Sequence, residues 1–62
     1  MSYLEERYEL VKAMRKGRIY SVTFTYDGES KTLRGKYGGR DSLGWLRLGD
    51  RHGHWSEVTA VE

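Results

Sequence analysis

Hydrophobic and polar residues alternate along two neighbouring segments of this 62-residue chain, residues 19–26 and 30–37. Between them lies Asp27-Gly28, a dipeptide that tolerates the positive φ angles of a tight hairpin turn. Because successive strand side chains point to opposite faces, the pattern predicts a β-hairpin with one apolar face and one polar, basic face. The apolar parity comprises Val22, Phe24, Tyr26, Leu33 and Tyr37.

A helical repeat precedes this hairpin. Apolar residues recur there at spacings of three and four, and charged residues occupy the other side. Ser2 followed by Glu5 fits a capping box, and Gly17 is a typical C-terminal stop. The pattern predicts a helix over residues 3–16. Its apolar positions are Tyr3, Leu4, Tyr8, Leu10, Val11 and Met14.

Two more strands are predicted after the hairpin, at residues 43–48 and 54–61. All connections, including Gly38 to Ser42 and Asp50 to Gly53, are too short for a helical crossover, so the strands should be antiparallel. The length allows one small domain, residues 1–62. We expect an α+β domain: an N-terminal helix followed by a four-stranded antiparallel meander, as a curled sheet or small SH3-like barrel.

The two tryptophans have two interpretations. One parity places Leu46, Leu48, Val58 and Ala60 inside and turns these residues outward: Trp45, Arg47, Trp55, Glu57 and Thr59. The opposite parity buries both Trp45 and Trp55 and exposes Leu46 and Leu48. A bulge at a glycine can mix the two. We favour an outward Trp45, which beside Arg47 suits stacking on bases or sugars, or a dimer contact.

The net charge of +2 is unevenly distributed. Residues 10–26 and residues 30–40 each hold four Lys or Arg and no acid, whereas the other segments are acidic. Such asymmetry is typical of a phosphate-binding face. The alternative is that these cations serve only to keep a small domain in solution.

The sequence lacks the residues that several classes of function require. The chain has no cysteine, which excludes disulfides and thiolate metal sites and favours a reducing compartment. It has no membrane-length apolar stretch and no signal-peptide region, so we expect a cytoplasmic protein outside the membrane. No nucleophile elbow or phosphate-binding loop is present. Asp50, His52 and His54 are too few for a structural zinc site, so we expect no catalytic residue, metal or cofactor.

Two local motifs resemble parts of known families. Residues 24–27, Phe-Thr-Tyr-Asp, with residues 31–35, Lys-Thr-Leu-Arg-Gly, resemble the central hairpin of the small Sulfolobus chromatin proteins, whose sheet lies across the DNA minor groove. Residues 45–49 are similar to that family's DNA-contacting Trp strand, although there it precedes the hairpin and the helix is C-terminal. Carried over by position, the resemblance implies these DNA-facing residues: Thr23, Thr32, Arg34 and Lys36.

The order of the elements resembles that of WYL-type and phage-encoded small SH3-like barrels. In those proteins a Thr- and Val-rich hairpin leads to a Trp-Leu strand, here Trp45-Leu46, and to a final strand, here residues 55–61. The Tyr of the Trp-Tyr-Leu triplet and the terminal basic residue that would bind a nucleotide ligand are missing here. Both resemblances imply binding of nucleic acids or nucleotides on an SH3-like sheet.

These observations predict a non-enzymatic, weakly sequence-specific nucleic-acid-binding module that uses the basic outer sheet face. The expected binding residues are Thr23, Lys31, Thr32, Arg34, Lys36, Arg40, Trp45 and Arg47. The alternative is a small protein-interaction module, such as a phage or mobile-element regulator that binds a host protein or self-associates. The wide apolar band of the helix weakly favours a homodimer.

Overall fold

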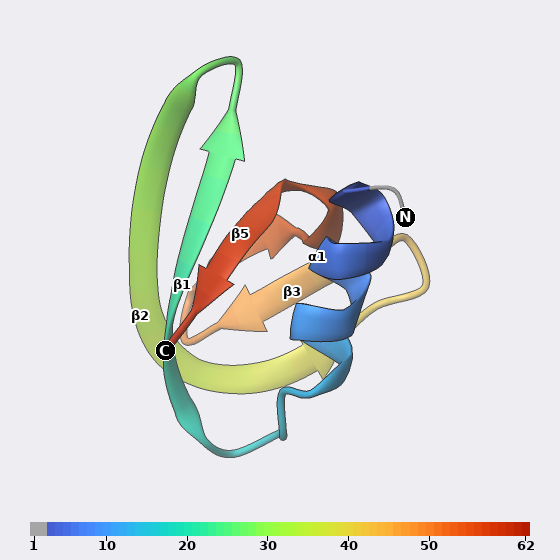
Figure 1. Cartoon of the computed structure of the whole chain (residues 1–62). Helices are drawn as coiled ribbons and strands as arrows, with labels where there is room; N and C mark the ends of the chain where they lie inside the picture. Colours follow the sequence, from blue (N-terminus) through green and yellow to red (C-terminus); the bar gives the residue numbers. More distant parts are fainter. Residues whose placement is uncertain (1–2) are drawn as a thin grey trace.

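The computed structural model describes residues 3–62 as one helix and one curled antiparallel sheet (Figure 1). The elements are α1 (Tyr3–Lys12), β1 (Ile19–Tyr26), β2 (Glu29–Arg40), β3 (Trp45–Leu48), β4 (Arg51–His54), the 3₁₀ helix η1 (Trp55–Glu57) and β5 (Val58–Val61). The sheet order is β4-β3-β2-β1-β5, so four strands form a meander and the fifth returns to pair with β1. The sheet is not closed, because β4 and β5 remain its two edges. The predicted α+β class is confirmed, with five strands instead of four.

The β1–β2 hairpin has the expected turn and faces. Asp27 and Gly28 adopt positive φ angles of 51° and 80°. Thr23 pairs with Thr32 across the strands, and Val22 pairs with Leu33. Val22 is buried and Leu33 is half-buried on the inner face, so the alternation assigned the two faces correctly.

β2 is longer than predicted, and it bends between its two partner strands (Figure 1). Its residues from Glu29 to Lys36 pair with β1, and its later residues pair with β3 (Figure 1). At Gly35, an added Cβ would lie 2.9 Å from the backbone carbonyl carbon of Leu48, so only glycine lets β3 approach this closely. Gly39 has a φ of +99°, where the pairing with β3 shifts register. The strand therefore runs through most of the predicted loop of residues 38–42.

The predicted strand at residues 54–61 is correct only over residues 58–61. Residues 51–54 form β4, η1 follows, and β5 begins only at Val58. His54 Nδ1 accepts a hydrogen bond from the Ser56 N–H at 3.2 Å, which caps the 3₁₀ turn. The Trp55 N–H donates to the Gly44 carbonyl at 3.0 Å, and the chain then turns toward β1. This corner allows β5 to pair with β1 through Val61 and Val22.

The helix ends at Lys12, four residues earlier than expected. Downstream, the Gly17 N–H donates to the Tyr37 carbonyl at 2.9 Å, and the Tyr37 N–H donates to the Arg18 carbonyl at 2.8 Å. These bonds to β2 require the chain to leave the helix before Gly17. The proposed cap at Ser2 lies outside the described residues.

The core lies between α1 and the concave side of the sheet. α1 packs on β5 and η1. The buried residues are Val11, Met14, Val22, Phe24, Tyr37, Leu46, Leu48 and Val58. Leu46 and Leu48 point inward as predicted, so the favoured parity of this strand is confirmed. Among the described residues, no helix has the length and apolar character needed to cross a bilayer.

Candidate nucleic-acid interface

Hydroxyl groups cover the outer face of β5, β1 and β2. Thr23 Oγ1 lies 3.0 Å from Thr32 Oγ1, in hydrogen-bonding contact. Thr25 Oγ1 is hydrogen-bonded to Ser30 Oγ at 2.9 Å and to Thr59 Oγ1 at 3.0 Å. These cross-strand bonds fix the side chains and leave an uncharged, polar surface on this face.

Two cations continue this face along β2. Arg34 Nη1 donates to Ser21 Oγ at 2.9 Å, on the residue opposite it in β1. Lys36 has the same parity two residues later and is exposed. Both therefore lie on the same face as Thr23 and Thr32, as the alternation predicted.

β3 adds Arg47 and Trp45 to the outer face. A Cβ at Gly38 would lie 3.1 Å from Arg47 Cδ, so the arginine stem crosses β2 at that glycine. Trp45 has the same parity and remains 44% exposed. Its ring meets the His54 ring edge-on, with centroids 5.2 Å apart. None of the outward-facing residues of β1, β2 and β3 is acidic.

Asp41 organises the turn that leads to Trp45. Its Oδ1 accepts hydrogen bonds from the backbone N–H groups of Leu43 and Trp45, both at 2.9 Å. The bond from Trp45 is the largest cause of a lowered pKa for the Asp41 carboxyl group. Sequence reasoning missed this residue, although an Asp beginning a short glycine-containing loop is typical of such a turn.

Arg40 contacts α1, and it also lines a hollow together with Trp45 and Arg47. Its guanidinium carbon is 4.9 Å from the centroid of the Tyr8 ring, and its Nη2 lies 3.4 Å from Tyr8 Oη. The Tyr8 ring in turn meets Trp55 edge-on at 5.5 Å. Burial raises the pKa of nearby Tyr37, and the Arg40 charge opposes that rise. Arg40 thus joins α1 to the sheet. Trp55 is half-buried and packs against the core, so its predicted outward position is wrong: it lies in η1, where the strand alternation does not apply.

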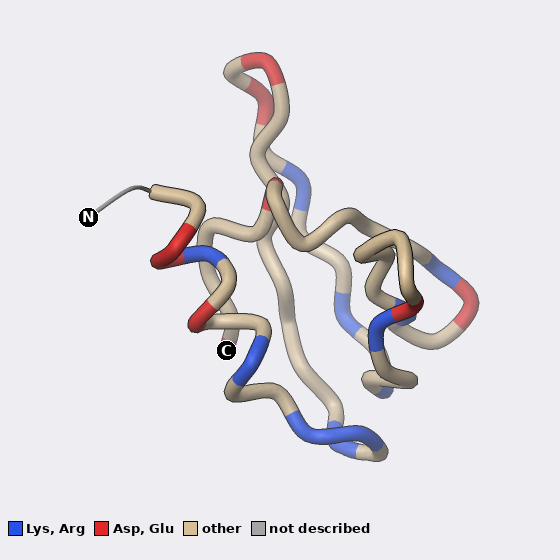
Figure 2. Tube along the Cα trace, turned by 90° about the vertical axis from the view of Figure 1, so that its right-hand side faces the viewer, with Lys and Arg blue, Asp and Glu red and all other residues tan. Residues whose placement is uncertain are grey.

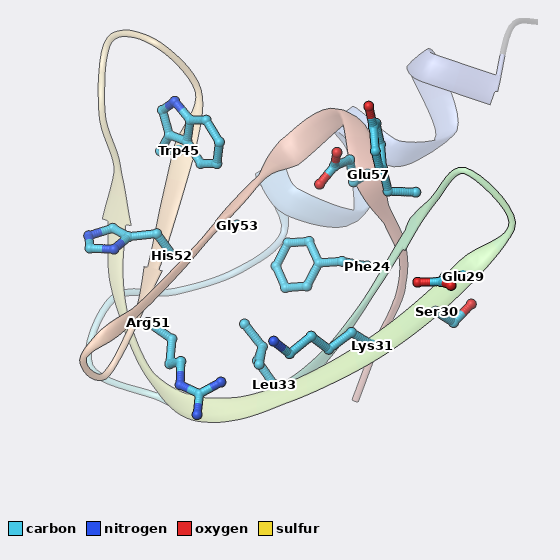
Figure 3. Close-up of a pocket in the computed structure, with 11 residues that line it drawn as sticks. Phe24, Glu29, Ser30, Lys31, Leu33, Trp45, Arg51, His52, Gly53 and Glu57 are labelled. Carbon is cyan, nitrogen blue, oxygen red and sulfur yellow. The ribbon is translucent and has the colours of Figure 1, made fainter.

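Lys31 lies on the opposite face of the hairpin from Thr32. It is paired with Phe24, and it lines a cleft of about 480 Å³ between the hairpin and β4 (Figure 3). Arg51 and His52 line the same cleft from β4. Sequence reasoning missed both residues because it treated Asp50 to Gly53 as a connection.

The histidines have separate surroundings. His54 Nε2 lies 2.9 Å from the Leu43 carbonyl, and Nδ1 lies 2.8 Å from Ser56 Oγ, so both ring nitrogens have partners. His52 pairs with Arg47 across β3 and β4 and is exposed. Across residues 3–62, no three His, Asp or Glu side chains are arranged to hold a metal ion.

The candidate residues therefore form three groups: an outer face, a cleft and a helix junction. The outer face has Thr23, Thr32, Arg34, Lys36, Trp45 and Arg47; the cleft has Lys31, and Trp45 also lines it; the junction has Arg40. In comparisons with known proteins, no family model, curated protein or solved structure matches the chain. Function is inferred from the geometry of the chain itself.

Proposed function

We propose that the protein is a non-enzymatic nucleic-acid-binding module that contacts phosphates through the outer face of β1, β2 and β3. The observation that carries this proposal is the acid-free row of Arg34, Lys36 and Arg47 beside the hydroxyls of Thr23 and Thr32. Lys and Arg neutralise backbone phosphates, and hydroxyl groups donate hydrogen bonds to phosphate oxygens. Such contacts give affinity that depends little on base sequence.

The helix does not supply a second mode of recognition. Its exposed positions include Glu6 and Glu9, which repel phosphates, and Val11 is buried against the rest of the domain. A protein that reads bases in the major groove would present a positively charged helix to the DNA. We therefore expect weak sequence specificity, in agreement with the resemblance of the β1–β2 hairpin to the Sulfolobus chromatin proteins.

Titration of fluorescently labelled oligonucleotides tests the proposal. Duplexes and single strands of several unrelated sequences are titrated with the protein at about 50 mM and about 200 mM salt, a range over which phosphate contacts weaken steeply. We expect binding at low salt that falls strongly at high salt and varies little with sequence. Absence of binding to every oligonucleotide at low salt would contradict the proposal.

A second candidate function, self-association or protein binding, is supported by an apolar hollow of about 530 Å³ beside α1. Leu4, Tyr8 and Trp55 contribute to its lining, and Leu4 and Tyr8 are 39% and 37% exposed. Exposed apolar surface of this kind marks interaction sites. Light scattering across a hundredfold dilution tests a homodimer: a mass that falls on dilution supports it, and a constant monomer mass contradicts it.

A further inference from the structure

The cleft that contains Lys31 adjoins a second hollow across β3 and β4. The second hollow, about 240 Å³, is lined partly by Gly38 and Arg47 on the outer face. Trp45 and His52 line both the cleft and this hollow. The cleft and the second hollow therefore meet at a ridge formed by Trp45 and His52, near the β4 edge of the sheet.

Cations lie on both sides of this ridge. On the cleft side, Lys31 extends from β2 toward Leu33, and Arg51 extends from β4 on the other side of Leu33 (Figure 3). On the outer side, Arg47 lies over Gly38. The cleft, the Trp45 ring and the second hollow together form a track, with Lys31 and Arg51 in the cleft and Arg40 and Arg47 in the second hollow.

The acids near the track do not interrupt it. Glu29 and Glu57 also line the cleft, but they lie toward the hairpin tip and η1, away from Arg51 and His52 (Figure 3). In the second hollow, Asp41 accepts two backbone hydrogen bonds through Oδ1, which hold it against its own turn. On the cleft side, His52 lies between Trp45 and Arg51, and both cations lie at the end of the cleft away from Trp45 (Figure 3).

We propose that this track binds single-stranded nucleic acid, with one base stacked on Trp45, a neighbouring phosphate held by Arg47, and phosphates farther along the strand held by Lys31 and Arg51. The inference rests on the proposed function and names the form of nucleic acid that the protein prefers. A base in a duplex is stacked and paired, so it cannot reach the ridge, whereas an unpaired base offers its face to an aromatic side chain. Stacking is tolerant of base identity, which agrees with weak sequence specificity.

Trp45 is positioned for this role before any ligand arrives. Its backbone N–H is held by Asp41, and one side of its ring is held by His54. Nearly half of the side chain nevertheless stays exposed. A fixed side chain loses little conformational entropy on binding, so its contact contributes more fully to affinity.

The test compares a single strand with a duplex of the same length and sequence, by anisotropy titration and Trp fluorescence. We expect the unmodified protein to bind the single strand more tightly, with quenching of Trp emission. Trp45→Ala should weaken single-strand binding by roughly 5- to 150-fold, the range of base–aromatic stacking, and abolish most of the quenching. Tyr3→Ala, which removes an exposed aromatic ring from α1, is the matched control and should change neither.

A second variant pair keeps the test independent of Trp45. Lys31→Gln with Arg51→Gln should lower single-strand affinity more than duplex affinity. The control, Lys12→Gln with Arg15→Gln, removes the same charge from α1 and its following loop and should lower the single-strand and duplex affinities equally.

Equal affinity of the protein for single strand and duplex, with no effect of Trp45→Ala on binding, overturns the single-strand track while leaving the proposed function intact. Competition by a poly-glutamate peptide that is as strong as by the oligonucleotide, and equally dependent on Trp45, also overturns it in favour of an acidic peptide ligand. No binding of either nucleic acid overturns both proposals.

Discussion

At Asp41, one carboxylate oxygen joins the end of β2 to the start of β3. This oxygen accepts hydrogen bonds from the backbone N–H groups of Leu43 and Trp45. The Asp41 N–H donates in turn to the Trp45 carbonyl at 3.1 Å. The turn that carries the exposed indole therefore depends on hydrogen bonds to the ionised, exposed side chain of Asp41. An ionised acceptor makes stronger hydrogen bonds than a neutral one.

The lowered pKa of Asp41 predicts a loss of stability in acid. Above the ordinary Asp value near 3.8, the carboxylate is ionised in both states and its stabilisation is fully present. As the pH falls below that value, the unfolded chain takes up a proton first, so the stabilisation is lost progressively toward the lower pKa of the folded state. Asp41→Asn, which cannot ionise, should lose less unfolding free energy than the unmodified protein between about pH 5 and pH 2 in urea titrations. Equal losses in the two proteins would show that Asp41 has no such role.

At the scale of the elements, the alternating pattern was sufficient to predict the β1–β2 hairpin but not the strands at the end of the chain. Val22 and Phe24 alternate with threonines, so register and faces followed directly from the sequence. β4 has no comparable pattern: its residues are Arg51, His52, Gly53 and His54, and the buried one is a glycine. The corner at η1 depends on a long-range bond from Trp55 to Gly44, which no local pattern reveals.

The residues of the candidate interface follow the same division between the predicted hairpin and the missed strand β4. Residues of the hairpin's polar parity were assigned to the correct face, and so were Trp45 and Arg47. Arg51 and His52 were missed together with the strand that carries them. The stacking of Arg40 on Tyr8 was also missed, because it joins residues separated by most of the sheet.

The contact between β4 and β1 leads to a prediction at Gly53. An added Cβ there would overlap the ring of buried Phe24, so Gly53→Ala should destabilise the domain by about 1–3 kcal/mol. Gly38→Ala is the matched control, because its Cβ would meet only the flexible stem of Arg47; it should change stability by no more than about 0.5 kcal/mol. Urea unfolding of both variants measures the difference. Equal stability of the two would mean that β4 does not pack on Phe24.

At the scale of the whole molecule, charge is separated along the long direction of the hairpin. Asp27 and Glu29 lie at its tip (Figure 2). The loop between α1 and β1, residues 13–18, is basic and lies at the opposite end (Figure 2). The cations Arg34 and Lys36 lie on β2 between these extremes, nearer the basic loop. A polyanion is therefore attracted toward the basic end and repelled from the tip, which orients it along the outer face before contact.

The most direct measurement of the central claim is the dependence of the binding constant on salt concentration for two double variants. For single strands, each phosphate contact contributes about 0.7 to the magnitude of the slope of log K against log salt. If Arg34 and Lys36 contact phosphates, Arg34→Gln with Lys36→Gln should reduce the magnitude of the slope by about 1.4. Lys12→Gln with Arg15→Gln removes the same charge from α1 and the loop after it, and should reduce the slope less, because neither residue lies on the outer face. An equal reduction by both double variants, or none by the first, would contradict phosphate binding on the outer face.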